Sequence, residues 1–197
     1  AFCGLLDVAT VHPDFTGDVP EVCGLPEPVS PHLGVAFINE VRSGLGAGTW
    51  RHRFIELVSA SHDPLDLDGW RLERGDGELV HAFGPTKLRP GDAAVVAGPR
   101  WPGRTDAVVL TEGPLVIGTT GTLSLVAPDG VVVDVFPLQS TLSSASLNRT
   151  LDGDPGSTPD DHTILTVDAT QASPGRRLDG RPWTAGPSPD AFVINEL

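Results

Sequence analysis

Hydrophobic side chains occur along the chain in short runs of four to eight residues, and glycine and proline separate these runs. Some runs alternate between two sets of side chains, as in Phe54-Ile55-Glu56-Leu57, and others are continuously apolar, as in residues 131–133. Both patterns are typical of β-strands. Three consecutive turns of helical periodicity occur nowhere in the sequence. The pattern therefore predicts an all-β protein with strands at residues 35–42, 53–60, 70–74, 78–83, 92–98, 107–110, 122–127 and 131–136.

The residues between these runs are suited to turns. Pro128-Asp129-Gly130 separates two apolar runs, and its glycine accepts the positive φ that a hairpin needs. Pro90-Gly91 is typical of a type II turn, in which proline fixes φ and glycine takes the left-handed position. Two flanking regions differ from this pattern. Residues 1–33, with five prolines, predict an extended arm, and residues 151–189 predict loop and linker with one strand at 163–167.

Length and charge restrict the classes of partner. A chain of 197 residues corresponds to one domain with long flanking segments, or at most to two small domains. Its 26 acidic and 13 basic side chains give a formal net charge of −13. This charge repels a phosphate backbone, so we expect no nucleic-acid partner. No stretch approaches the roughly 18 apolar residues of a membrane-spanning helix, so we expect no membrane span.

The sequence contains no methionine, and a small residue, Ala1, stands first. We expect a processed chain that is exported after removal of a signal peptide, although trimming of a longer precursor leaves the same trace. Cys3 and Cys23 are an even pair in the N-terminal segment, which predicts a disulfide in an exported protein. Two free thiols in a cytosolic protein are the alternative.

Seven motifs follow one another along the chain: FINEV (37–41), FIEL (54–57), DLDGWRL (66–72), LRPGDAAVVA (88–97), TLSLVAPDGVVVDVF (122–136), SASLNRTLDGD (144–154) and ASPG (172–175). In order and spacing they resemble the lamin-tail domain family over residues 34–176. The resemblance implies an immunoglobulin-like β-sandwich of the secreted bacterial type, which serves protein association and carries no catalytic set of its own. The cysteine-bearing arm and the 22 residues after ASPG depart from the family pattern.

The same residues predict a core and an organisation into parts. Trp70 follows an Asp68-Gly69 turn, from which a large aromatic side chain enters the space between two sheets. We expect the core to consist of Phe37, Ile38, Ile55, Leu57, Trp70, Leu72, Val95, Leu123, Leu125 and Val133. The expected parts are a disulfide-tied arm (1–33), the sandwich (34–176), a Pro/Gly-rich linker (177–190) and a C-terminal strand (191–197).

The C-terminal sequence AFVINEL (191–197) nearly repeats VAFINEV (35–41), the first expected strand of the sandwich. Three interpretations are open. The segment begins a second domain of a tandem array, pairs at the other edge of its own sheet, or adds to the sheet of a neighbouring subunit. Head-to-tail addition of the last kind propagates into a filament. The expected association strand consists of Phe192, Val193, Ile194, Asn195, Glu196 and Leu197.

Signals for catalysis and metal binding are thin. The six histidines lack paired-ligand spacing, and no serine-hydrolase elbow or phosphate-binding loop is present. A cluster of aspartates offers weak calcium candidates, but these residues do not fit the twelve-residue calcium loop, and solvated turn residues are the preferred interpretation. The cluster consists of Asp152, Asp154, Asp160 and Asp161. Asn148-Arg149-Thr150 is a formal glycosylation sequon, and we expect Arg149 to tie a loop by forked hydrogen bonds.

These features together predict a protein without enzymatic activity, catalytic residues or cofactors. We expect an extracellular or cell-surface structural or adhesive protein that acts by protein-protein association. Its partner is itself or a cell-surface component, and the expected assembly is a homo-oligomer or polymer. The alternative hypothesis is an accessory module that anchors a secreted hydrolase or positions its substrate.

Overall fold

The computed structural model describes residues 30–44, 49–103, 105, 107–111, 113–139, 145–161 and 172–183. These residues form short strands and one 3-10 helix, η2 (Thr49–His52). The strands are β1 (Ala36–Arg42), β2 (Phe54–Ser59), β3 (Leu65–Asp66), β4 (Arg71–Arg74), β5 (Leu79–Ala82), β6 (Lys87–Leu88), β7 (Ala93–Ala97), β8 (Val108–Leu110), β9 (Gly121–Val126), β10 (Val132–Leu138), β11 (Leu147–Arg149) and β12 (Pro159–Asp161).

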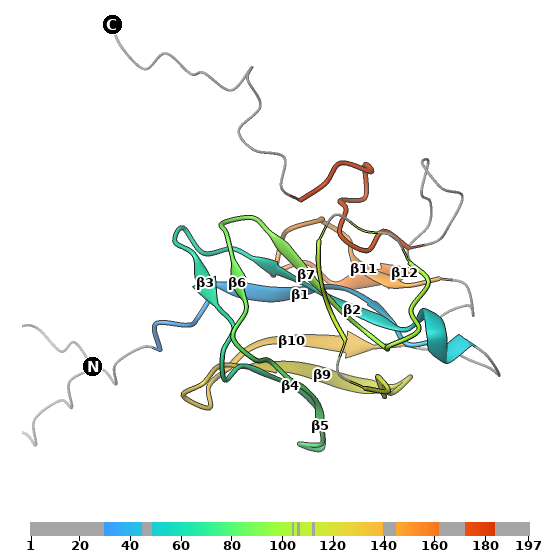
Figure 1. The fold of residues 1–197 in the computed structure, drawn as a ribbon, viewed down its shortest axis with the longest axis horizontal. Helices are drawn as coiled ribbons and strands as arrows, with labels where there is room; N and C mark the ends of the chain where they lie inside the picture. Colours follow the sequence, from blue (N-terminus) through green and yellow to red (C-terminus); the bar gives the residue numbers. More distant parts are fainter. Residues whose placement is uncertain are drawn as a thin grey trace, which may run out of the picture. The chain divides into compact units, whose positions relative to one another are not determined.

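Two sheets form the layers of a β-sandwich, seen one above the other in Figure 1. The six-stranded sheet has the order β12-β11-β1-β2-β7-β8, and the four-stranded sheet has the order β10-β9-β4-β5. A small third sheet pairs β3 with β6. Among the described strands only β7 and β8 run parallel. The predicted all-β class is confirmed, and the eight predicted runs correspond to β1, β2, β4, β5, β7, β8, β9 and β10.

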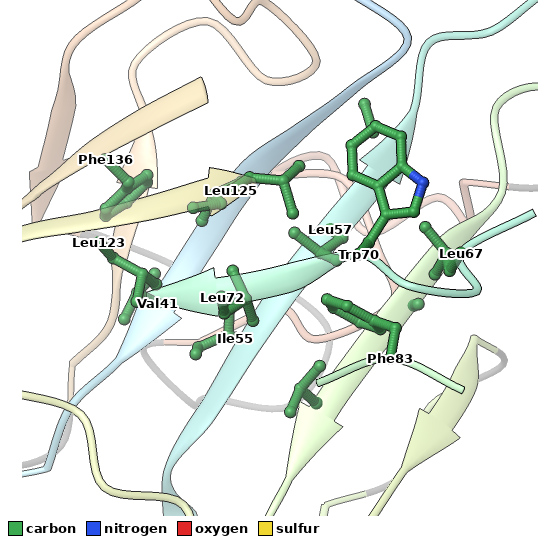
Figure 2. Packing of buried hydrophobic residues seen from close by; sticks show 14 of the residues in the cluster. Val41, Ile55, Leu57, Leu67, Trp70, Leu72, Phe83, Leu123, Leu125 and Phe136 are labelled. Carbon is green, nitrogen blue, oxygen red and sulfur yellow. The ribbon is translucent and has the colours of Figure 1, made fainter. Parts of the chain in front are cut away.

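The core fills the space between the two sheets (Figure 2). Trp70 is 1% exposed and enters this space where Gly69, with φ of 78°, reverses the chain. Its backbone accepts a hydrogen bond from Phe83 N and donates one to Leu67 O, so β4 begins in a fixed position. The six-stranded sheet contributes Ile38, Val41, Ile55 and Leu57, and the four-stranded sheet contributes Leu72, Leu123, Leu125 and Phe136.

A β-bulge in β1 sets which side chains enter this core. Ile38 pairs with Leu57 and Glu40 pairs with Glu56, so Asn39 is an extra residue in β1. An extra residue breaks the alternation of side chains along a strand. Ile38 and Val41 therefore both belong to the core, and Asn39 and Glu40 lie together on the outer face of the sheet.

A segment near the C-terminus, the C-terminal strap (residues 172–183), covers this outer face; Figure 1 shows it in red above the six-stranded sheet. At one end Trp183 packs on Phe37, Val58 and Ala93. At the other end the strap contributes Ala172, which clusters with the side chains of Phe54, Val95 and Ala97. The six-stranded sheet is therefore buried on both faces.

The strap changes two details of the expected organisation. Phe37 and Val95 are buried, but they lie beneath the strap and not between the sheets, because they occupy outward positions of β1 and β7. The packed chain also extends past residue 176, where we placed the end of the sandwich, because Trp183 is held against the sheet. The first strand of the sandwich, β1, lies inside its sheet between β11 and β2.

Candidate functional site

Two glutamates lie directly opposite each other beneath the C-terminal strap. Glu40 on β1 and Glu56 on β2 are register partners, and both are 0% exposed. Side chains at such positions have Cβ atoms about 4.5–5.5 Å apart, and like charges there destabilise a sheet. The pair lies between the two apolar clusters of the strap, so the outer face is apolar at both ends and acidic in the middle.

Glu40 binds the beginning of the strap. Its Oε1 accepts hydrogen bonds from Ser146 Oγ and, at 2.9 Å, from Ser173 N. Its Oε2 accepts a hydrogen bond from Ser173 Oγ at 3.0 Å. Ser146 precedes β11 and Ser173 belongs to the strap, so one carboxyl group joins β1 to two segments that are far away in sequence.

Glu56 binds the middle and the end of the strap. Its Oε2 accepts a hydrogen bond from Gly175 N. Its Oε1 accepts from Trp183 Nε1 at 3.1 Å and from Asn39 Nδ2 at 3.0 Å. All three donors are N–H groups, which satisfy a carboxylate without offering it an acceptor.

The bulged residue Asn39 links the pair to the loop after β11. Its Nδ2 also lies 3.3 Å from Asn148 Oδ1 and 3.1 Å from Asp152 Oδ1, and its Oδ1 accepts from Gly153 N at 3.2 Å. Asp152 in turn accepts a hydrogen bond from Leu178 N in the strap at 2.7 Å. The strap is thus tied to β1, to β2 and to the loop that follows β11.

A tight turn in the strap brings its N–H groups to the two carboxyls. Ser173-Pro174-Gly175-Arg176 closes with a hydrogen bond from Arg176 N to Ser173 O at 2.8 Å, and Gly175 has φ of 79°. Proline followed by a left-handed glycine is the preferred sequence of a type II turn. A Cβ atom on Gly175 would lie 1.7 Å from Thr105 Oγ1, so close packing also requires glycine here.

Arg149 holds the two sheets together beside this site. It is 3% exposed on β11, and its Nη2 binds both carboxylate oxygens of Asp134 on β10 at 2.8 and 2.9 Å. Its Nε donates to Ile38 O at 2.8 Å, next to the bulge. Its Nη1 donates to the carbonyls of Pro155 and Ser157. The loop-tying role expected for Arg149 is therefore present, and it extends to the opposite sheet.

Burial raises the pKa of both glutamates. For Glu40, loss of hydration is the largest cause and raises the pKa from 4.5 to about 7, although hydrogen bonds from Ser146 and Ser173 act in the opposite direction. For Glu56 the pKa lies well above 4.5, first because of burial and then because of the charge of Glu40. Two carboxyls this close titrate as a pair, and the pair retains at least one proton at neutral pH.

Two of the four aspartates considered for calcium accept hydrogen bonds from the protein itself. Asp152 is bound to Asn39 and Leu178, and Asp154 Oδ1 accepts from Gly156 N within its own turn. Asp160 and Asp161 are consecutive residues of β12. Within the described ranges no group of three or more His, Cys, Asp or Glu residues is arranged to hold a metal ion.

Other predicted residues have different outcomes. Cys3, Cys23, the expected strand at 163–167 and the association strand at 192–197 lie outside the described residues. Asn148 of the sequon is 2% exposed, and its Nδ2 donates to Arg149 O at 2.7 Å, so the folded domain offers no access for a glycan. In the part of the chain that the structure covers, no helix has the length and apolar character needed to cross a membrane.

Comparison with known proteins gives no identification. The chain matches no protein-family model and no curated protein. The polar cluster around Glu40 and Glu56 must therefore be interpreted from its own geometry. It is a buried set of hydrogen bonds that joins the six-stranded sheet to the C-terminal strap.

Sequence reasoning missed this cluster, although FINEV and FIEL contain both glutamates. A signal was present in β2. Phe54, Glu56 and Val58 share one face of the strand, and the first and last of these are apolar, so that face had to be covered. A glutamate between two covered positions is itself buried and needs hydrogen-bond donors from the covering segment.

Proposed function

We propose that the protein is an extracellular, non-enzymatic β-sandwich module of the immunoglobulin-like, lamin-tail type that acts by self-association. The observation that carries the non-enzymatic part is the sealing of the acidic pair. Glu40 and Glu56 are 0% exposed, and the oxygens of both accept hydrogen bonds from the chain itself. Carboxyls in this state hold a fold together and do not reach a substrate.

The association part rests on the edges of the two sheets. The edge strands of β-sheets are commonly protected against pairing with another chain by charges, prolines or bulges. β12 carries two aspartates and a proline, β10 carries Pro137 and a bulge, and the pairing of β5 with β4 is also irregular. β8 has none of these devices, and its Val108 and Val109 are each 41% exposed. β8 is therefore the described edge best suited to accept another strand.

The donor in this proposal is the segment Phe192–Leu197 of a second copy. The described chain ends at Trp183, which lines one small pocket together with Ala107 and Val108 at the start of β8. Residues 184–190, with two prolines, would span about 22 Å when extended. The segment itself contains the apolar residues Phe192, Val193, Ile194 and Leu197 and no proline, so its side chains and its backbone N–H groups suit strand addition.

Size-exclusion chromatography with light scattering on the full chain and on a chain that ends at Asp190 tests the proposal. We expect concentration-dependent oligomers for the full chain and monomers for the truncated one. The variant Val109→Pro should also give monomers, because proline removes a backbone donor from β8, and the matched variant Val132→Pro at the β10 edge should not.

Three results would contradict the proposal. Oligomers that persist without residues 191–197 would exclude strand addition by this segment. A full chain that is monomeric at all concentrations would mean that the segment does not bind a second copy. The accessory-module hypothesis predicts the second result, because such a module needs a catalytic domain as its partner. Loss of oligomers in Val132→Pro but not in Val109→Pro would mean that β10, and not β8, accepts the added strand.

A further inference from the structure

The hydrogen bonds from the strap turn end on ionisable groups. Ser173 N and Oγ bind Glu40, and Gly175 N and Trp183 Nε1 bind Glu56. Beneath the strap lie Phe37, Phe54 and Val58, which are buried on the outer face of the six-stranded sheet. The charge on two carboxyl groups therefore governs whether an apolar sheet face stays covered.

We propose that Glu40 and Glu56 form a proton-operated latch, which holds the C-terminal strap closed while the pair carries a proton and releases it when both carboxyls are ionised. Release uncovers the outer face of the six-stranded sheet and leaves the core between the sheets intact. The two layers are held together separately, by their own apolar cluster and by the ion pair of Arg149 with Asp134.

The charges around the pair do not neutralise it. On β1, Arg42 is the cation that acts on Glu40, but it is half-buried and its Nε makes no hydrogen bond within the described residues. Arg149 is committed to Asp134, and the strap cations Arg176 and Arg177 bind Gly180 O and the ring of Trp183. Asp152 adds negative charge close to both glutamates. The outward positions of β7 are apolar.

The donors around each carboxyl indicate where the proton lies. Glu56 receives three N–H groups, none of which accepts a hydrogen bond, so an added proton on Glu56 would meet no acceptor among them. Glu40 receives two hydroxyl groups, from Ser146 and Ser173, and a hydroxyl accepts as well as donates. Glu40 can therefore share a proton with a serine hydroxyl, and the pair as a whole carries at least one proton while the strap is closed.

The direction of the pH effect follows from burial. The closed strap keeps the pKa of Glu40 near 7, and opening returns this carboxyl to water, where its pKa approaches 4.5. Between these values the closed state binds more protons than the open state, so closure is favoured at the lower end and weakened as the pH rises. The opening equilibrium constant rises by up to about tenfold per pH unit for each proton that opening releases.

Hydrogen exchange of the full chain, measured by mass spectrometry from pH 5 to pH 9 and corrected for chemical exchange, tests the latch. We expect protection of the strap amides, including Ser173 and Gly175, to fall by tenfold or more across this range. Amides of β9 should stay more protected than the strap amides at every pH, because they exchange only when the core between the sheets opens. Quenching of tryptophan fluorescence by acrylamide should rise in parallel, and this rise should be absent in Trp183→Phe, which keeps the other three tryptophans.

Two variants separate the latch from a general effect of pH. Glu40→Gln keeps one acceptor and one donor for Ser146 and Ser173 but removes one of the two charges, so the strap should stay protected about one pH unit or more further into alkali. Glu78→Gln, in the exposed turn between β4 and β5, should leave the profile unchanged. Strap protection that is independent of pH, or that equals the protection of β9 throughout the range, would overturn the proposal. If Glu40→Gln fails to fold, the comparison of strap and β9 in the unmodified chain still decides.

Discussion

Replacement of Gly175 by alanine should be one of the most damaging single-methyl additions in this protein. Gly175 has φ of 79°, and a non-glycine residue in the left-handed region costs about 1–2 kcal/mol. The added Cβ would also lie 1.7 Å from Thr105 Oγ1 and 3.0 Å from Ala107 Cβ, so the turn must move away from β8. Movement breaks the hydrogen bond from Gly175 N to Glu56, and a buried charged acceptor left without its partner costs about 1–3 kcal/mol or more.

These contributions predict a loss of about 3–5 kcal/mol in the free energy of unfolding, measured by urea denaturation. Gly77→Ala is the matched control, because Gly77 has φ of 83° and no atom within 4 Å of an added Cβ. It should lose only the conformational part, about 1–2 kcal/mol. Adding Thr105→Ala to Gly175→Ala should recover part of the loss, since the nearest obstructing atom is gone. If Gly175→Ala costs no more than Gly77→Ala, the close-packed carboxylate contact is not what fixes the strap.

Three further predictions concern the same region. The free energy of unfolding of the unmodified chain, relative to that of Glu40→Gln, should fall as the pH rises from about 5 through 7. The reason is that the native pair binds protons that the unfolded chain has released. Urea denaturation of both proteins at several pH values measures this difference in stability, which would not change with pH if the pair were already ionised. Arg149→Ala should lower the free energy of unfolding by about 3–5 kcal/mol, because it leaves Asp134 buried without its cation. Arg149→Lys should recover little of this loss, because a lysine cannot make the same set of hydrogen bonds. Equal stability of Arg149→Lys and the unmodified chain would argue against this account. Trp183→Phe should keep most of the packing on Phe37 and lose the hydrogen bond to Glu56. The free energy of unfolding, measured by thermal or urea unfolding, should fall by about 1.5–3 kcal/mol. An unchanged stability would mean that the indole N–H contributes nothing.

The strands were predictable where side-chain pattern alone determines structure. β2, β7 and β9 are runs of apolar residues bounded by turn residues, and their positions follow from the sequence. β11 was missed because its residues Leu147, Asn148 and Arg149 are largely polar, and they are buried only through contacts with Asn39 and Asp134 from distant strands. The two-residue strands β3 and β6 carry too little pattern to be recognised.

The placement of Phe37 shows that a buried residue of a strand need not belong to the core between the sheets. Phe37 and Ile38 are consecutive, so they point to opposite faces and cannot both enter the space between the sheets. Only the strap explains why both are buried, and the strap packs through residues that follow a long polar segment. The glutamate pair was hidden for the same reason. Its partners Ser173, Gly175 and Trp183 lie more than 110 residues away, and nothing in the local sequence announces them.

The extra residue in β1 has a consequence for how this strand tolerates change. With Asn39 removed, Ile38 and Glu40 would become neighbours and keep their partners Leu57 and Glu56, so Ile38 and Val41 would still face the core in strict alternation. The packing between the sheets therefore does not need the extra residue. What a deletion takes away is the side chain that joins β1 to Asn148, Asp152 and Gly153, so its damage should fall on the loop after β11 and on the strap.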